Sequence, residues 1–177
     1  MALSRLHFFG GVSLEVHDRT IRNFGTTRAA KLLVLLSLTK SGRMPRTQLA
    51  QQLWPDDFYD STRLRLRQEI HRLKRVLEEL SDLIGSDQND VWIDKSRVTS
   101  DVDLLHNVIK GREEPTAESC LVGEFLPGWD DTWAIAERTH VHQLQVQAGI
   151  SLGTQKLEHG DADGALAVAR KLVAQHP

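Results

Sequence analysis

The chain has 177 residues, 40% of them hydrophobic and 26% charged, which is ordinary for a globular protein of one domain or two small ones. The longest apolar run, Leu32 to Leu36, is far too short to span a bilayer, and we expect no signal peptide and no membrane as a partner. The single cysteine, Cys120, excludes an internal disulfide and fits a reducing compartment, so we expect a cytoplasmic protein.

The net charge of −2 conceals an uneven distribution along the chain. Residues 1–100 contain 16 Lys/Arg and 12 Asp/Glu, a net +4, whereas residues 101–177 contain 6 and 12, a net −6. An excess of positive charge in the first half is a modest indication of a polyanionic partner for that half.

Short strands and then two helices are expected at the start of the chain. Apolar residues alternate on both sides of Gly10-Gly11, which predicts two or three short antiparallel strands within residues 3–21. Residues 28–40 are apolar around most of the helical circumference and predict a buried helix capped by Thr26-Thr27. Residues 46–54 predict a shorter helix that ends before Pro55.

The segment from Asp60 to Leu80 is expected to be a long helix with two contrasting faces. Apolar residues at spacings of 4, 3, 4 and 3 predict a face that packs into a core: Leu66, Ile70, Leu73, Leu77 and Leu80. The roughly opposite face contains Leu64, Gln68, His71, Arg72 and Arg75. Residues 63–75 hold six Lys/Arg and one acid, and such a cationic helix suits the major groove of DNA. A solvated surface helix of mixed charge is the alternative interpretation.

Further short strands are expected at the middle of the chain, at residues 83–84, 91–93 and 97–99. Strands, three helices and a hairpin follow one another in the order of a winged helix, where the third helix reads bases and the hairpin is the wing. Helices are then expected over residues 101–111, 133–158 and 162–175, with a loop at 112–119 and a compact aromatic turn at 123–133. The predicted fold class is mainly α with small antiparallel β, a winged helix-turn-helix followed by an all-helical domain.

Five stretches, in this order and spacing, resemble a known family: TTRAAKLLVLLSL, RTQLAQQLWPDD, LRQEIHRLKRVL, VTSDVDLL and GEFLPGWDDTWAIAER. They are similar to bacterial transcriptional regulators of the antibiotic-regulatory (SARP-like) type, which join an OmpR-like winged helix to a helical bacterial transcriptional activation domain. The resemblance covers nearly the whole chain. It implies a DNA-binding domain over residues 1–100 and an activation domain over residues 101–177.

The spacing of Gly160, Ala165 and Pro177 is similar to that of a tetratricopeptide repeat, so the end of the activation domain is expected to be TPR-like. Such an array would normally continue past Pro177, which suggests a fragment or a short family member. The resemblance further implies a two-component-like output domain that binds direct repeats in double-stranded DNA as a head-to-tail homodimer. The helical domain would mediate dimerisation and contact RNA polymerase.

The resemblance also assigns the candidate DNA contacts. The positions that match the family's base-reading residues are Arg65, Gln68, Glu69 and Arg72. Arg can pair with guanine and Gln with adenine, whereas Glu69 can accept only from cytosine N4 and is more simply explained as holding Arg65 and Arg72 in a fixed pose. The expected phosphate contacts are Arg46, Thr47, Arg63, Arg67, Lys74 and Arg75.

The expected wing departs from the family pattern. Its tip, residues 86–90, contains Asp87 and Asp90 where OmpR-like proteins often have Arg and Gly. Two carboxylates beside a phosphate ribbon would repel it, so contact between the wing and the minor groove is in doubt.

No enzyme, cofactor or metal site is expected. No nucleophile or phosphate-binding motif occurs, and His140 and His142 point away from each other on a helix. Asp161-x-Asp163-Gly164 lacks the later ligands of a calcium loop and is better explained as a turn between helices. The alternative function is a protein- or ligand-binding signalling module in which the winged helix does not bind DNA.

Overall fold

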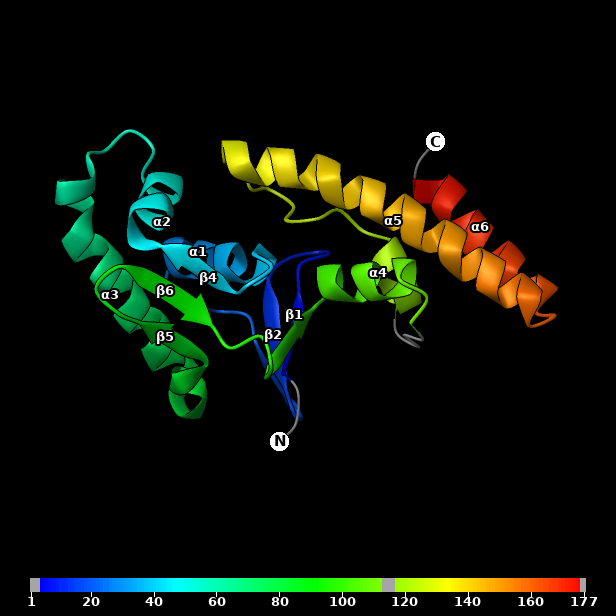
Figure 1. Ribbon diagram of the computed structural model, residues 1–177, viewed down its shortest axis with the longest axis horizontal. Coiled ribbons are helices and arrows are strands. Elements are labelled where there is room, and N and C mark those ends of the chain that lie inside the picture. The colour runs from blue at the N-terminus through cyan, green and yellow to red at the C-terminus, as the bar shows by residue number, and fades with distance from the viewer. Residues whose placement is uncertain (1–3, 113–116, 176–177) are drawn as a thin grey trace. The chain divides into compact units, whose positions relative to one another are not determined.

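The computed structural model describes residues 4–112 and 117–175, and for Tyr59 only the backbone (Figure 1). The described residues are 59% helical, with six α-helices and small antiparallel sheets. This confirms the prediction of a mainly helical chain with small antiparallel β-structure. No helix among the described residues is both long and apolar enough to cross a lipid bilayer.

The chain divides into two compact units. Unit 1 comprises Met1–Arg5 and Val12–Thr99, and unit 2 comprises Leu6–Gly11 and Ser100–Pro177. The division at Thr99 lies next to the boundary expected from the sequence, but residues 6–11 group with unit 2. They do so because the Phe8 amide donates to Asp101 Oδ2 at 2.7 Å and the Phe8 ring packs edge-on against Phe125, with centroids 5.7 Å apart.

Two small sheets are present. The first has the strand order β3-β2-β1-β7, and its strands are β1 (Ser4–His7), β2 (Ser13–Val16), β3 (Arg19–Ile21) and β7 (Val98–Ser100). The strands expected within residues 3–21 are therefore confirmed. The second sheet has the order β4-β6-β5, and its strands are β4 (Arg43–Pro45), β5 (Ile84–Ser86) and β6 (Asp90–Ile93).

The hairpin of β5 and β6 depends on one glycine. Gly85 lies opposite Trp92 in the antiparallel pair, and a Cβ at Gly85 would lie 2.1 Å from Trp92 Cε2. The indole therefore occupies the space that a side chain at position 85 would need. Strand β4 pairs with the other edge of β6, so that Met44 faces Val91 and Pro45 faces Asp90.

Three helices complete unit 1: α1 (Thr27–Leu38), α2 (Arg46–Leu53) and α3 (Tyr59–Leu77). Thr26 caps α1, since its hydroxyl accepts from the Ala29 amide at 3.0 Å. The apolar residues of α1 are buried almost all round, as the sequence indicated.

Helix α3 is shorter than expected. It ends at Leu77 because Glu78 adopts a positive φ of 52°, and residues Glu78–Leu83 form a 3-10 helix, η1. Arg19 holds Glu78 in place with an ion pair of 2.8 Å. The prediction that Leu80 continues the apolar face of the same helix is therefore wrong.

Unit 2 contains α4 (Asp101–Ile109), a 3-10 helix η2 (Ala117–Leu121), α5 (Thr132–Glu158) and α6 (Ala162–Gln175). Ser100 and Asp103 form a capping box at the start of α4. Of the predicted loop 112–119, residues 113–116 lie outside the described residues, and residues 117–119 belong to η2. Pro177, expected to stop the last helix, also lies outside them.

The long helix α5 packs along α6 (Figure 1). Gly149 permits this approach, because a Cβ there would lie 2.5 Å from Leu172 Cδ1. Within α5, the Arg138 guanidinium donates to the carbonyls of Phe125 and Leu126 at 3.0 and 2.8 Å and so fastens the loop that precedes the helix. The Trp129 and Trp133 rings meet edge-on with centroids 5.9 Å apart, which confirms the compact aromatic turn.

Candidate nucleic-acid interface

Helix α3 has the two faces that its sequence predicts. Leu66, Ile70, Leu73 and Leu77 are buried in unit 1. The other side is exposed and basic, and it presents Arg63, Arg65, Arg67, Gln68, His71, Arg72 and Arg75. Lys74 is half-buried at the border between the two faces. The apolar face thus fixes the helix, and the charged face is available to solvent within unit 1.

Glu69 lies on the buried side of α3 rather than at the surface. Only 5% of the residue is exposed, and its two oxygens accept from Arg72 Nη1 at 2.5 Å and from the Thr26 hydroxyl. Burial and two hydrogen bonds favour a positioning role for this carboxylate over a contact with cytosine, and the assignment of Glu69 as a base contact stays a prediction. Its predicted role in holding Arg72 fits the geometry.

Arg65 is held by a different carboxylate from the one expected. Its Nη1 donates to Asp57 Oδ2 at 2.7 Å, in the loop before α3. The predicted pairing of Arg65 with Glu69 is therefore wrong. By contrast, Arg63, Arg67 and Arg75 form no ion pair with any described residue. Three of the predicted phosphate contacts thus keep their full charge available to a polyanion.

An open cleft of about 1050 Å³ runs between α3, the start of α2 and the turn of the β5–β6 hairpin. Its lining residues are Arg46, Asp60, Arg63, Leu64, Leu66, Arg67, Asp87, Gln88 and Asn89. The cleft brings together three of the predicted phosphate contacts, which come from two different helices. The hairpin wall, residues 87–89, is the part of this surface to which the sequence assigned no contact.

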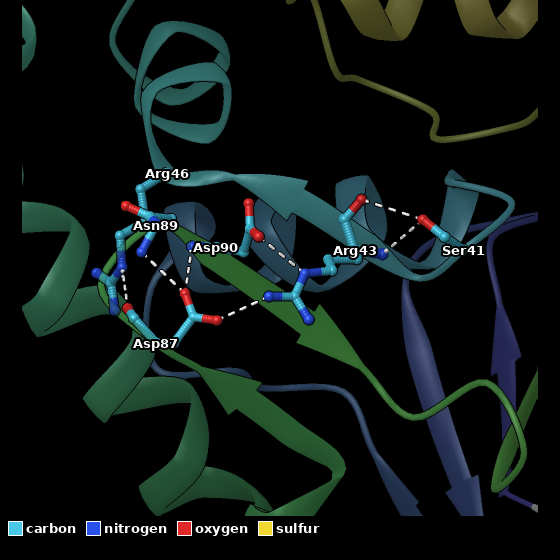
Figure 2. Close-up of polar contacts among 6 residues, drawn as sticks. All are labelled: Ser41, Arg43, Arg46, Asp87, Asn89 and Asp90. Carbon is cyan, nitrogen blue, oxygen red and sulfur yellow. Dashed lines mark hydrogen bonds and ion pairs between the residues drawn. The ribbon is translucent and has the colours of Figure 1, made fainter.

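The hairpin tip is acidic, but its carboxylates are paired within unit 1 (Figure 2). Arg43 donates to Asp87 Oδ2 at 2.7 Å and to Asp90 Oδ2 at 2.8 Å, and its guanidinium lies over the Trp92 ring, 4.6 Å from the centroid. The other Asp87 oxygen accepts from the amides of Asn89 and Asp90 at 2.8 and 2.7 Å. The amides of Asp90 and Asn89, and then Arg43, hold the pKa of the Asp87 carboxyl below its ordinary value.

This network changes the expectation that the acidic tip repels phosphate. A single guanidinium pairs with both aspartates and offsets one of their two negative charges, while Asp87 stays partly exposed beside the neutral Gln88 and Asn89. This role of Arg43 could not be predicted from the sequence, because Arg43 lies 44 and 47 positions away from the two aspartates.

Arg46 joins the start of α2 to the hairpin tip. Its amide donates to the Asn89 carbonyl and its Nε donates to the Asp87 carbonyl, both at 2.8 Å (Figure 2). The side chain is half-buried and lines the cleft, whereas Thr47 is exposed one position later. Of the two predicted contacts at the start of α2, Arg46 thus belongs to the cleft and Thr47 is not among its lining residues.

No protein-family model and no curated protein matches this chain. The resemblance to antibiotic-regulatory proteins accordingly stays a prediction, and the chemistry of the site is argued from its geometry.

The remaining motifs have structural explanations. Asp161 Oδ1 accepts from the Gly164 amide at 2.8 Å and its other oxygen pairs with Lys156 at 3.4 Å, so the aspartate caps α6 in the turn between two helices. No group of three or more His, Cys, Asp or Glu side chains within residues 4–112 and 117–175 could hold a metal ion. The indole nitrogen of Trp133 is buried without a hydrogen-bond partner among the described residues.

Proposed function

We propose that this protein is a sequence-specific, non-enzymatic DNA-binding regulator of transcription. In this proposal unit 1 is a winged helix, α3 is its recognition helix and the β5–β6 hairpin is its wing. The observation that supports it is the pairing of a core-anchored α3 with an exposed arginine face beside an open cleft. An α-helix of this kind fits the major groove, where base edges are accessible.

The individual roles follow from how each side chain is held. Arg63, Arg67 and Arg46 line the cleft and are assigned to phosphates, together with Thr47, Lys74 and Arg75. Gln68 and Arg72 are assigned to base edges, since Gln pairs with adenine and Arg with guanine. The buried Glu69 carboxylate holds Arg72 through an ion pair, and 44% of the Arg72 side chain remains exposed for such a contact. Arg65 is tied to Asp57 through Nη1, and 48% of its side chain remains exposed, so its other nitrogens are available for a base.

The roles proposed for unit 2 are self-association on direct repeats and contact with RNA polymerase. Large apolar side chains are exposed on α5 and α6, namely Ile135, Ile150, Leu157, Leu166 and Val173. Exposed apolar side chains favour a protein partner over a nucleic acid.

The same side chains favour a second candidate function. Unit 2 alone would be the working part, a protein-binding signalling module, and the winged helix would be structural. The net −6 of residues 101–177 also agrees with a protein rather than a nucleic acid as partner of unit 2.

Fluorescence anisotropy of the full chain with a labelled duplex of about two helical turns separates the two candidates. Five cations are assigned to phosphates, so log K should fall with log salt at a slope of about −4 to −5 between roughly 50 and 200 mM salt. Removing two of the charges, Arg63→Gln with Arg67→Gln, should make the slope shallower by about 2.

The matched control is Arg170→Gln on α6, which removes an exposed arginine of unit 2 and should leave the slope unchanged. Binding that is absent, or independent of salt, would reject the DNA-binding proposal and leave the signalling module as the better explanation.

A further inference from the structure

Leu64 is an apolar residue at the centre of the charged face of α3. It is 63% exposed, and only one other large hydrophobic residue described in unit 1, Phe58, is exposed. Leu66 and Leu73, two of the leucines that anchor the helix, are by contrast fully buried. Leu64 therefore makes no comparable contribution to the core.

Helix geometry places Leu64 at the point of α3 farthest from the core. Leu64 and Leu73 are nine residues apart, which at about 100° per residue puts them on opposite sides of the helix. Gln68 and His71 share this outermost stripe, and Arg63 and Arg67 flank it on the side of the cleft. When a helix lies in the major groove, the side chains farthest from the core are those that approach the base edges.

The chemistry of the major groove contains one apolar feature. Guanine, adenine and cytosine present hydrogen-bond donors and acceptors there, whereas thymine adds a C5-methyl group. An exposed leucine cannot hydrogen-bond to a base or pair with a phosphate, but it can remove that methyl group from water.

We propose that Leu64 is a specificity-determining residue that reads thymine through its C5-methyl group. This inference rests on the proposed function and adds a residue to the base-reading set. Leu64 and Gln68 are four residues apart, which is about 6 Å of helix rise. This is nearly twice the base-pair spacing of about 3.4 Å, so the two side chains can contact different base pairs of one site. The preferred site then contains a thymine close to an adenine read by Gln68.

The test uses uracil, which differs from thymine only in lacking the C5-methyl group. The full chain first selects duplexes from a random pool, and each thymine of the selected site is then replaced by uracil in turn. One replacement should weaken binding of the wild-type protein roughly fourfold, the effect of withdrawing about one buried methyl group. The variant Leu64→Ala should bind thymine and uracil versions of that position equally well.

Two further measurements separate this role from a structural one. Leu64→Ala should keep the wild-type melting temperature and salt slope, because an exposed leucine is replaced by a strong helix former without a change of charge. The matched control Leu166→Ala, another exposed leucine on α6, should retain the wild-type response to uracil.

The inference is overturned if uracil at every position binds the wild-type protein as tightly as thymine, or if Leu64→Ala remains as sensitive to uracil as the wild-type protein. In either case a selected site and a steep salt dependence would leave the proposed function standing. Failure to select any site, with no salt-dependent binding, would overturn both.

Discussion

Glu69 offers the most direct test of how α3 is held in unit 1. Its carboxylate accepts from the Thr26 hydroxyl at the start of α1 and from Arg72 one turn along α3. A hydrogen bond between a hydroxyl and a buried carboxylate contributes about 1.5–3 kcal/mol. The partly exposed ion pair with Arg72 adds about 0.5 kcal/mol after allowance for solvent screening. Glu69→Ala should therefore lower the free energy of unfolding by about 2–3 kcal/mol.

The measurement is urea-induced unfolding of the full chain at fixed salt and pH. Glu69→Gln keeps an acceptor for Thr26 but opposes Arg72 with an amide group, so its loss should be smaller than that of Glu69→Ala. Thr26→Ala combined with Glu69→Ala should destabilise by less than the sum of the single changes, because both remove the same hydrogen bond.

The control is Glu79→Ala, an exposed glutamate of η1 in the same unit, which should change stability by no more than about 0.5 kcal/mol. If Glu69→Ala is no more destabilising than this control, or if the double change is additive, the bridge between α1 and α3 does not stabilise the fold and the reasoning fails.

Two further predictions concern helix α3 and the β5–β6 hairpin. Arg72→Ala should weaken binding to the selected site by about 1–3 kcal/mol and relax its sequence preference, whereas Lys74→Ala should weaken all duplexes alike and reduce the salt slope by about 1. Equal losses for both variants on selected and random duplexes would contradict these roles. Because the pKa of Asp87 is lowered, its charged form stabilises the hairpin fully at any pH well above 3.8, the ordinary pKa of an aspartate. This contribution is lost as the pH falls through the lower pKa of the folded state. Acid titration of the Asp87 carboxyl by NMR should give a midpoint below 3.8, and Arg43→Gln should raise it.

The sequence predicted α3 well because its leucines repeat with helical period and its charges lie between them. The same periodicity could not place the end of the helix, since Leu80 continues the spacing while Glu78 breaks the backbone conformation. Strand β4 was missed because three residues that include Pro45 show neither alternation nor strand propensity. Local patterns thus define elements but not the points at which tertiary contacts interrupt them.

The contacts that shape the candidate site were harder to predict, because they join residues far apart in the sequence. Thr26 and Glu69 are 43 positions apart, and Arg43 and Asp87 are 44 apart. The sequence could show that Glu69 lies near Arg72 on one helix, but not that the carboxylate turns inward. It could show an acidic hairpin tip, but not the arginine of another strand that pairs with both of its aspartates.

The environment of Arg43 has a consequence for how this sequence can diverge. One flat guanidinium meets two aspartates and an indole ring at once, and a lysine, with a single compact ammonium, cannot reproduce all three contacts. We therefore expect substitutions at four positions to be coupled: Arg43, Asp87, Asp90 and Trp92. Loss of the arginine alone would leave both aspartates beside the cleft without this cationic partner, so we expect the four positions to change together.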